Sequence, residues 1–171
     1  MVCESNKKSY LKSQNLQIIG QSTLRGEVKI SGAKNSALVL LAASLLTDEK
    51  IILDNVPQLT DIKKMGKILE NLGVRLQNKH DQLIIDSQNL FIQELPYELV
   101  SGLRASFFCI GPLLTRFGEA SISFPGGCNI GERPINEHIN GLKALGSEII
   151  IEKGIIKAKL SGKKSKLFGA N

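Results

Sequence analysis

The loop of residues 124–134, FPGGCNIGERP, places a cysteine among glycines and close to an arginine. Glycines free the backbone and let a ligand approach closely, and the proline suits the first turn of a following helix. A thiol near Arg133 and a helix N-terminus can have a lowered pKa, so Cys128 could act as a nucleophile or a proton donor. The alternative is a mobile loop in which the cysteine has no chemical role.

Two further stretches carry cations where an extended segment meets a helix. In SGAKNS, residues 31–36, a glycine allows the turn, and Lys34 and Asn35 follow in the first turn of a predicted helix. In GLRASF, residues 102–107, Arg104 heads another apolar helix at the corresponding joint. Free amides at a helix N-terminus attract anions, and both cations would add to that attraction. A solvated Lys34 and a snorkelling Arg104 are the structural alternatives.

The other cysteines and histidines do not suggest a second site. Cys3, Cys109 and Cys128 form no CxxC pair and no metal-binding spacing, so we expect no metal, and no resolving cysteine lies near Cys128 for a redox role. Cys109 lies in the apolar string FFCIGPLL and is expected in the core. His138 is expected to be structural or capping, which argues against a Cys/His hydrolase. The sequence contains no Walker A or GxGxxG motif.

Short β-type runs alternate with helical segments, which predicts an α/β (α+β) fold. Residues 59–73 form an amphipathic helix with Thr60 or Asp61 as its N-terminal cap and Gly73 at its end. Its apolar face consists of Ile62, Met65, Ile68, Leu69 and Leu72. Further helices are predicted over 34–47, 104–118 and 134–146, and strands over 16–20, 26–31, 50–56, 74–77, 82–86, 120–124, 147–152 and 154–160.

The same order of elements occurs twice. LLTD at 45–48 matches LLTR at 113–116, and ILENLGVRL at 68–76 matches GLKALGSEI at 141–149. Repeated units bury their apolar faces against one another, so two units can be an incomplete set. The sequence predicts a polar tail, a first unit with its entry strand, a second unit and a basic truncated end over 1–15, 16–90, 91–160 and 161–171.

The formal charge of +6 is concentrated at the two ends of the chain. Residues 13–152 carry 13 Lys and Arg against 15 Asp and Glu, a net charge of −2. Because the middle is acidic and poor in aromatic residues, a nucleic-acid-directed protein that uses the Lys-rich tail is disfavoured. The start lacks the apolar stretch of a secretory signal, and no apolar run is long enough to span a membrane. The few cysteines favour a cytoplasmic location.

Taken together, the strings SGAKNSAL, LRASFF.IGPLL.R and PGGC.IG.RP...HI.GL..LG resemble the N-terminal part of the UDP-N-acetylglucosamine enolpyruvyl transferases, or 1-carboxyvinyltransferases. The resemblance runs from near Leu16 to the last residue. It implies an incomplete inside-out barrel of repeated βαβαββ units. The implied reaction transfers the enolpyruvyl group of phosphoenolpyruvate to the sugar 3-hydroxyl, releases phosphate and commits the sugar nucleotide to peptidoglycan synthesis, without a cofactor. The PGGC loop favours this branch over 5-enolpyruvylshikimate-3-phosphate synthase, which shares the fold and chemistry.

The resemblance also implies roles for individual residues. Lys34 and Asn35 match the phosphoenolpyruvate contacts of the family, and Arg104 matches an arginine assigned to the sugar nucleotide. Cys128 matches a cysteine on a closing loop that donates a proton to the enolpyruvyl methylene carbon and is alkylated by fosfomycin. Catalysis would thus depend on Cys128 and Lys34. The segment that matches the sugar-nucleotide binding stretch is Arg133, Pro134, Ile135, Asn136 and Glu137.

The chain also departs from this family. Members are more than twice as long, and their general-base aspartate and a further arginine lie in the C-terminal domain. Asn136 stands where many members have aspartate. We therefore expect a truncated portion of the enzyme that is inactive alone and needs a complementary C-terminal polypeptide. The alternative is a non-catalytic remnant or a split-enzyme subunit that binds the sugar nucleotide or a complementary fragment. In either case we expect neither nucleic acid nor membrane as a partner.

Overall fold

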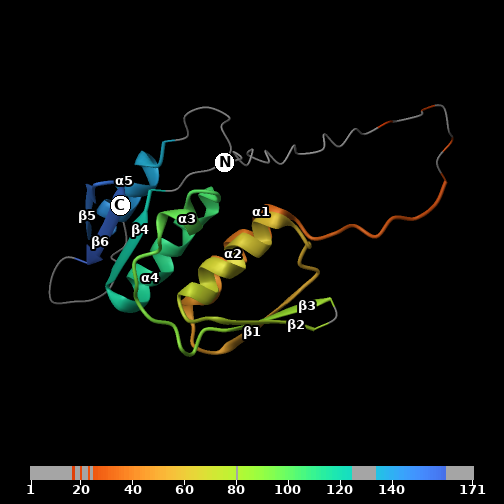
Figure 1. Ribbon diagram of the computed structural model, residues 1–171, viewed down its shortest axis with the longest axis horizontal. Coiled ribbons are helices and arrows are strands. Elements are labelled where there is room, and N and C mark those ends of the chain that lie inside the picture. Colours follow the sequence, from red (N-terminus) through yellow and green to blue (C-terminus); the bar gives the residue numbers. More distant parts are fainter. Residues whose placement is uncertain are drawn as a thin grey trace, which may run out of the picture.

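The computed structural model describes residues 17, 20, 23, 25–79, 81–124 and 134–160 (Figure 1). The first half of the chain contains α1 (Lys34–Ala43), the 3₁₀ helix η1 (Ser44–Leu46), β1 (Lys50–Asp54), α2 (Thr60–Asn71), β2 (Arg75–Lys79) and β3 (Gln82–Asp86). The second half contains α3 (Tyr97–Val100), the 3₁₀ helix η2 (Arg104–Cys109), α4 (Ile110–Phe117), β4 (Glu119–Ser123), α5 (Asn136–Ala144), β5 (Ser147–Glu152) and β6 (Ile155–Leu160). The predicted mixture of helices and strands is confirmed.

Within the described residues, each half builds a three-stranded antiparallel sheet with the same strand order. β3 lies between β1 and β2, and β6 lies between β4 and β5. The pairs Leu53–Leu83 and Ile122–Ile156 occupy corresponding positions in the two sheets, each one residue before the end of the outer strand. In Figure 1, the helices α1, α2 and α4 lie between the sheets, which do not close into a barrel. The repeated topology agrees with the repeat in the sequence.

Helix α2 packs through the apolar face that its sequence predicts. Every member of that face is buried: Ile62, Met65, Ile68, Leu69 and Leu72. Because each fully buried aliphatic side chain contributes about 1.5–3 kcal/mol, this face holds α2 against α1 and β2. The chain leaves the helix at Gly73, as predicted, with a φ of 91° that favours glycine. A Cβ at this position would overlap the carbonyl oxygen of Asn89.

The predicted N-terminal cap of α2 is wrong. Thr60 is the first helical residue and Leu59 occupies the cap position, where no side chain of the described residues makes a capping hydrogen bond. A cap must stand before the first turn, whereas Asp61 lies within that turn and pairs with Lys34 of α1. The acidic residue therefore connects two helices instead of closing one.

The helices of the two halves pack in parallel. η1 continues α1 in the first half, and α4 continues η2 in the second half. Helix α1 contacts η2 and η1 contacts α4, so start lies beside start and end beside end. Arg116 near the end of α4 reinforces this packing, because its Nη1 donates to the carbonyl oxygens of Leu45, Thr47 and Ser87 at 3.2, 3.0 and 3.3 Å. Carbonyls at the end of a helix lack intrahelical donors, and a nearby cation satisfies them. Arg116 thus fastens the end of α1–η1 to the second half.

Two of the predicted helices each consist of an α-helical part and a 3₁₀ part. The helix predicted over 34–47 is α1 followed by η1, and the helix predicted over 104–118 is η2 followed by α4. Pro112 explains the second change, because it has no N–H to donate to Phe108 and its ring crowds that carbonyl. The turn before α4 therefore takes the tighter 3₁₀ form.

The strand predicted over 26–31 is absent. Strands are stabilised by hydrogen bonds to a neighbour, and no described segment pairs with these residues. The side chains of Val28 and Ile30 are 83% and 78% exposed, so the apolar pattern that suggested a strand has no surface to cover within the described chain. Of the strand predicted over 16–20, only residues 17 and 20 are described.

Cys109 lies in the core as predicted, and burial raises the pKa of its thiol from 9.0 to about 12.

Because of this raised pKa of Cys109, we expect the free energy of unfolding to fall between pH 9 and about pH 12. In that range the unfolded thiol has lost its proton while the folded thiol keeps it, so the slope contributed is at most about 1.4 kcal/mol per pH unit. Urea unfolding at increasing pH measures this slope. Cys109→Ala should remove that part of it, and equal slopes in both proteins would contradict the assignment.

Candidate active site

The N-termini of α1, α2 and η2 lie at one end of the helix layer. Lys34, the first residue of α1, forms an ion pair with Asp61 in the first turn of α2, with 2.8 Å between Nζ and Oδ2. Arg104 is the first residue of η2, which packs parallel to α1. Lys34 and Arg104 therefore stand at the same end of neighbouring helices.

Arg104 also connects this end to the start of α5. Its Nη2 donates to the carbonyl oxygen of Pro134 at 3.2 Å. Lys64 of α2 donates to the carbonyl oxygen of Gly102 at 3.1 Å and so fixes the turn that precedes Arg104. The GLRASF stretch and the segment that begins at Pro134 are thereby brought together.

The electrostatics of this end favour an anion. Among the described residues, no side chain makes a capping hydrogen bond at the N-terminus of α1 or of α5. The helix dipoles add partial positive charge beside Lys34 and Arg104. Asp61 and Glu137 of the first turns supply opposing negative charge. The side chains of Lys34 and Asp61 are 45% and 33% exposed, so their ion pair is accessible to a ligand.

The segment from Pro134 divides into anchoring and exposed residues. Ile135 is buried in the core and holds the start of α5 in place, whereas Asn136 and Glu137 are exposed in its first turn. His138 follows, with its ring edge-on to Phe107 at 5.5 Å between centroids. That packing agrees with a structural role for the histidine.

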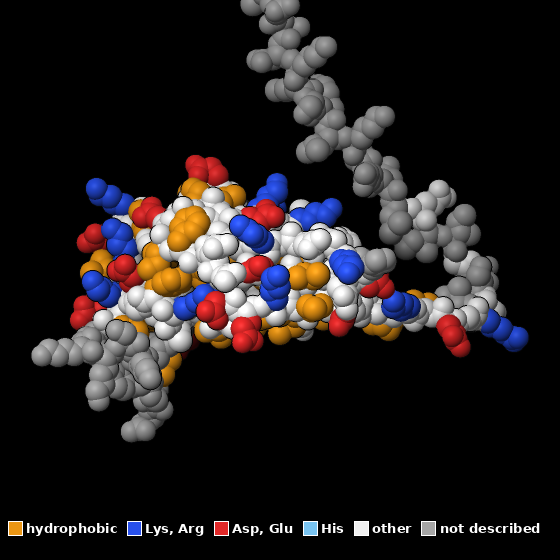
Figure 2. All heavy atoms as spheres, turned by 90° about the horizontal axis from the view of Figure 1, so that it is seen from below, with side chains coloured by type: hydrophobic (Ala, Val, Ile, Leu, Met, Phe, Trp, Pro, Cys, Tyr) orange, Lys and Arg blue, Asp and Glu red, His pale blue; other side chains and the backbone are white. Residues whose placement is uncertain are grey.

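Cys128 and Arg133 lie outside the described residues, so their predicted roles stay predictions. Within the described part of the chain, no group of three or more His, Cys, Asp or Glu is placed to hold a metal ion. No described helix is long and apolar enough to cross a membrane. On the face shown in Figure 2, basic and acidic side chains alternate with apolar ones and do not form a broad basic surface.

Asp61 and Lys64 contribute to this end in ways that the sequence does not predict. They contact partners 27 and 38 residues away, and no local pattern indicates contacts at such separations. In the sequence, Asp61 stands out only as a residue type that caps helices, and Lys64 only as a polar position of an amphipathic helix.

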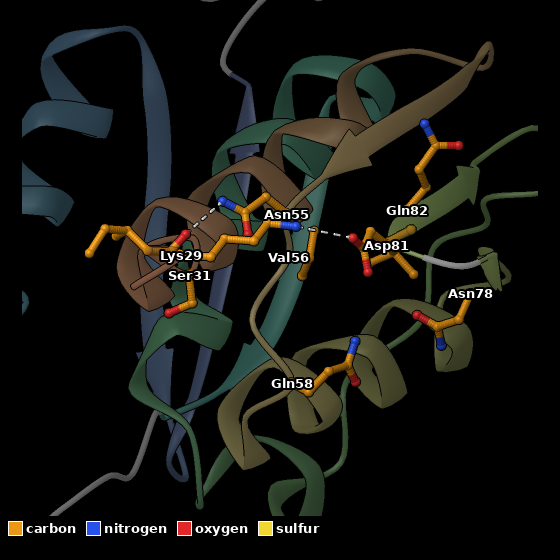
Figure 3. A pocket seen from close by; sticks show the side chains of 10 residues that line it. Lys29, Ser31, Asn55, Val56, Gln58, Asn78, Asp81 and Gln82 are labelled. Atoms are coloured by element: carbon orange, nitrogen blue, oxygen red, sulfur yellow. Dashed lines mark hydrogen bonds and ion pairs between the residues drawn. The ribbon is translucent and has the colours of Figure 1, made fainter. Parts of the chain in front are cut away.

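A cavity of about 260 Å³ is lined by none of the predicted site residues. Its walls are Lys29, Ile30, Ser31, Asn55, Val56, Gln58, Asn78, Asp81, Gln82 and Leu83. Figure 3 shows Lys29 reaching Asp81, with 3.4 Å between the charged atoms, and the amide of Asn55 facing the carbonyl of Ile30 at 3.5 Å. Both members of the ion pair are more than four-fifths exposed, so it contributes little stability. Residues 29–31 of the cavity wall precede α1 in the chain. The cations Lys34 and Arg104, in contrast, lie outside this cavity at the N-termini of α1 and η2.

Comparisons with known proteins agree on one family. The EPSP synthase (3-phosphoshikimate 1-carboxyvinyltransferase) family matches residues 18–171. A UDP-N-acetylglucosamine 1-carboxyvinyltransferase of Prochlorococcus marinus (strain MIT 9515) is 82% identical over 171 residues, which are 100% of this chain and 37% of that protein. One of Parasynechococcus marenigrum (strain WH8102) is 52% identical over 170 residues, 99% of this chain and 39% of that protein. The chain thus spans less than half the length of these relatives.

The enolpyruvyl transferase NikO from Streptomyces tendae has a similar structure. Its TM-score is 0.69 at 21% sequence identity, over 83% of this chain and 31% of that one. At this identity the likeness concerns the fold. It confirms the enolpyruvyl transferase architecture that the sequence predicts, with the barrel incomplete.

We expect Gly32→Ala to disturb the start of α1. A Cβ at Gly32 would overlap the backbone carbonyl oxygen of Asn55, which cannot move aside as a flexible side chain does. Overpacking of this kind costs about 1–3 kcal/mol. Urea unfolding would measure the loss. Gly141→Ala in α5 is the matched control, because its Cβ would meet no atom within 4 Å. Equal stability of the Gly32→Ala and wild-type proteins would contradict this close approach.

Proposed function

Because the chain belongs to the EPSP synthase family, we propose that it forms the N-terminal portion of a UDP-N-acetylglucosamine enolpyruvyl transferase. The observation that carries the proposal is the 82% identity, over the whole chain, to a relative of that name. The reaction would transfer the enolpyruvyl group of phosphoenolpyruvate to the 3-hydroxyl of UDP-N-acetylglucosamine and release phosphate. It would commit the sugar nucleotide to peptidoglycan synthesis in the cytoplasm.

In this proposal, the cations at the N-terminal end of the helices bind the anionic groups of the substrates. Lys34 and Asn35, in the first turn of α1, contact phosphoenolpyruvate, whose charge the helix dipole also stabilises. Arg104 and the segment from Arg133 to Glu137 bind the sugar nucleotide. The hydrogen bond from Arg104 to the carbonyl of Pro134 supports a joint role for these two stretches.

The thiol of Cys128 has the proposed role of proton donor to the enolpyruvyl methylene carbon. The sugar hydroxyl oxygen adds to the neighbouring carbon while its proton passes to the general-base aspartate of the C-terminal domain, which gives a tetrahedral intermediate. This intermediate loses phosphate, and its methyl proton returns to the Cys128 thiolate, which restores the double bond. The positive charge of Lys34 and Arg104 stabilises the anionic groups of that intermediate. A free thiol has a pKa of about 8.5, so the protonated form needed for donation is present at neutral pH.

The remainder of the enzyme would come from a C-terminal polypeptide that the relatives possess. The exposed apolar side chains in the segment 26–31 and on α1 and η2 offer surfaces for it: Val28, Ile30, Val39, Leu40 and Phe108. Because apolar side chains gain free energy when removed from water, these surfaces favour a covering partner. We therefore propose that the isolated chain has no turnover.

A chimaera tests the function. In it, this chain replaces the matching 37% of the Prochlorococcus marinus MIT 9515 relative, and phosphate release is measured with both substrates. We expect turnover by the chimaera and none by the isolated chain. Arg104→Met should lower kcat/KM about tenfold to a hundredfold, the effect of losing a charged hydrogen bond of about 1.5–3 kcal/mol. Arg75→Met on β2 is the matched control, and Cys128→Ser should abolish turnover.

Two results would contradict these proposals. A folded chimaera without phosphate release would refute the assigned reaction, provided that the intact relative is active under the same conditions. Turnover by the isolated chain that depends on Cys128 would show instead that no further polypeptide is needed. Circular dichroism of every protein confirms that inactivity does not reflect unfolding.

A further inference from the structure

Asp61 makes the contact that a substrate anion would make. Its carboxylate lies 2.8 Å from the ammonium group of Lys34, at the adjacent starts of two helices. In the first turn of α2, this carboxylate is also stabilised by the dipole of its own helix. It is held at the head of α1, where phosphoenolpyruvate has been proposed to bind.

We propose that Asp61 is a positioning residue that holds the Lys34 ammonium group at the head of α1 and competes there with the bound anion. The inference rests on the proposed function, in which Lys34 contacts phosphoenolpyruvate. An entering anion must share or displace the carboxylate, and after phosphate forms the carboxylate regains the ammonium group. Asp61 thereby lowers the affinity of the site for phosphate and favours its release.

The size of this competition is limited by solvent. The two side chains are 45% and 33% exposed, and ion pairs at such positions contribute between nothing and about 1 kcal/mol. The upper half of that range, about 0.5–1 kcal/mol, corresponds to phosphate binding that is about two- to fivefold tighter, and this is the effect that we expect when Asp61 is neutralised. Loss of Lys34 should act in the opposite direction, because it removes the cation that attracts the phosphate.

Binding of inorganic phosphate to the 171-residue chain tests the inference, with NMR titration of the backbone amides of Lys34 and Asn35 as the measurement. We expect Asp61→Asn to bind phosphate about two- to fivefold more tightly than wild type, and Lys34→Gln to bind more weakly. Asp48→Asn is the matched control. It changes the net charge equally but lies beyond η1, at the opposite end of the parallel helices, and should have little effect.

The side-chain ammonium signal of Lys34 provides a second measurement. A hydrogen-bonded ammonium group exchanges its protons slowly, so we expect this exchange to be faster in Asp61→Asn than in wild type and to slow again when phosphate is added. A purely structural Asp61 would produce no recovery with phosphate.

The outcomes separate the inference from the proposed function. If Lys34→Gln weakens phosphate binding while Asp61→Asn behaves like Asp48→Asn or binds more weakly than wild type, the competition is refuted and the role of Lys34 survives. If Lys34→Gln binds phosphate like wild type, the proposed role of Lys34 fails, and the inference fails with it. Absence of phosphate binding in both wild type and Asp61→Asn also overturns the inference.

Discussion

The parallel packing of α1–η1 against η2–α4 is the constraint on which the rest of the molecule depends. Parallel neighbours place all their N-termini at one end and all their carbonyl ends at the other. At the carbonyl end, the guanidinium of Arg116 satisfies acceptors from the first half of the chain. At the amide end, helix dipoles and cations accumulate. The charge asymmetry that suits an anionic substrate therefore follows from the way the helices pack.

Lys34 and Arg104, the two cations at the amide end, each have a partner within the molecule. Lys34 is paired with Asp61, and Arg104 donates to the carbonyl of Pro134, so each cation already has a defined direction before any ligand binds. Such preorganisation reduces the entropy that a ligand must remove on binding. It also couples separate segments of the chain, because Arg104 can keep its contact only while α5 begins where it does.

The sequence predicts most elements correctly where local periodicity and burial agree. The apolar face of α2, the glycine that ends it and the strands β2 and β3 are examples. The failures have non-local causes. Residues 26–31 have a strand pattern but no partner strand, and Asp61 has a capping residue type but a neighbour in another helix. Lys34 and Arg104 were identifiable as equivalent joints of a repeat, whereas the contact from Arg104 to Pro134 depends on tertiary packing.

The contact made by Arg116 gives the two halves a fixed order. A guanidinium only donates hydrogen bonds, and it reaches back to carbonyl groups of the preceding half. At the matching place in the sequence repeat, the first half carries Asp48, whose carboxylate only accepts. Exchanging the two halves would therefore set a carboxylate against carbonyl oxygens, with no proton between them. Although the halves share a topology, the hydrogen bonds at their junction are therefore not interchangeable between them.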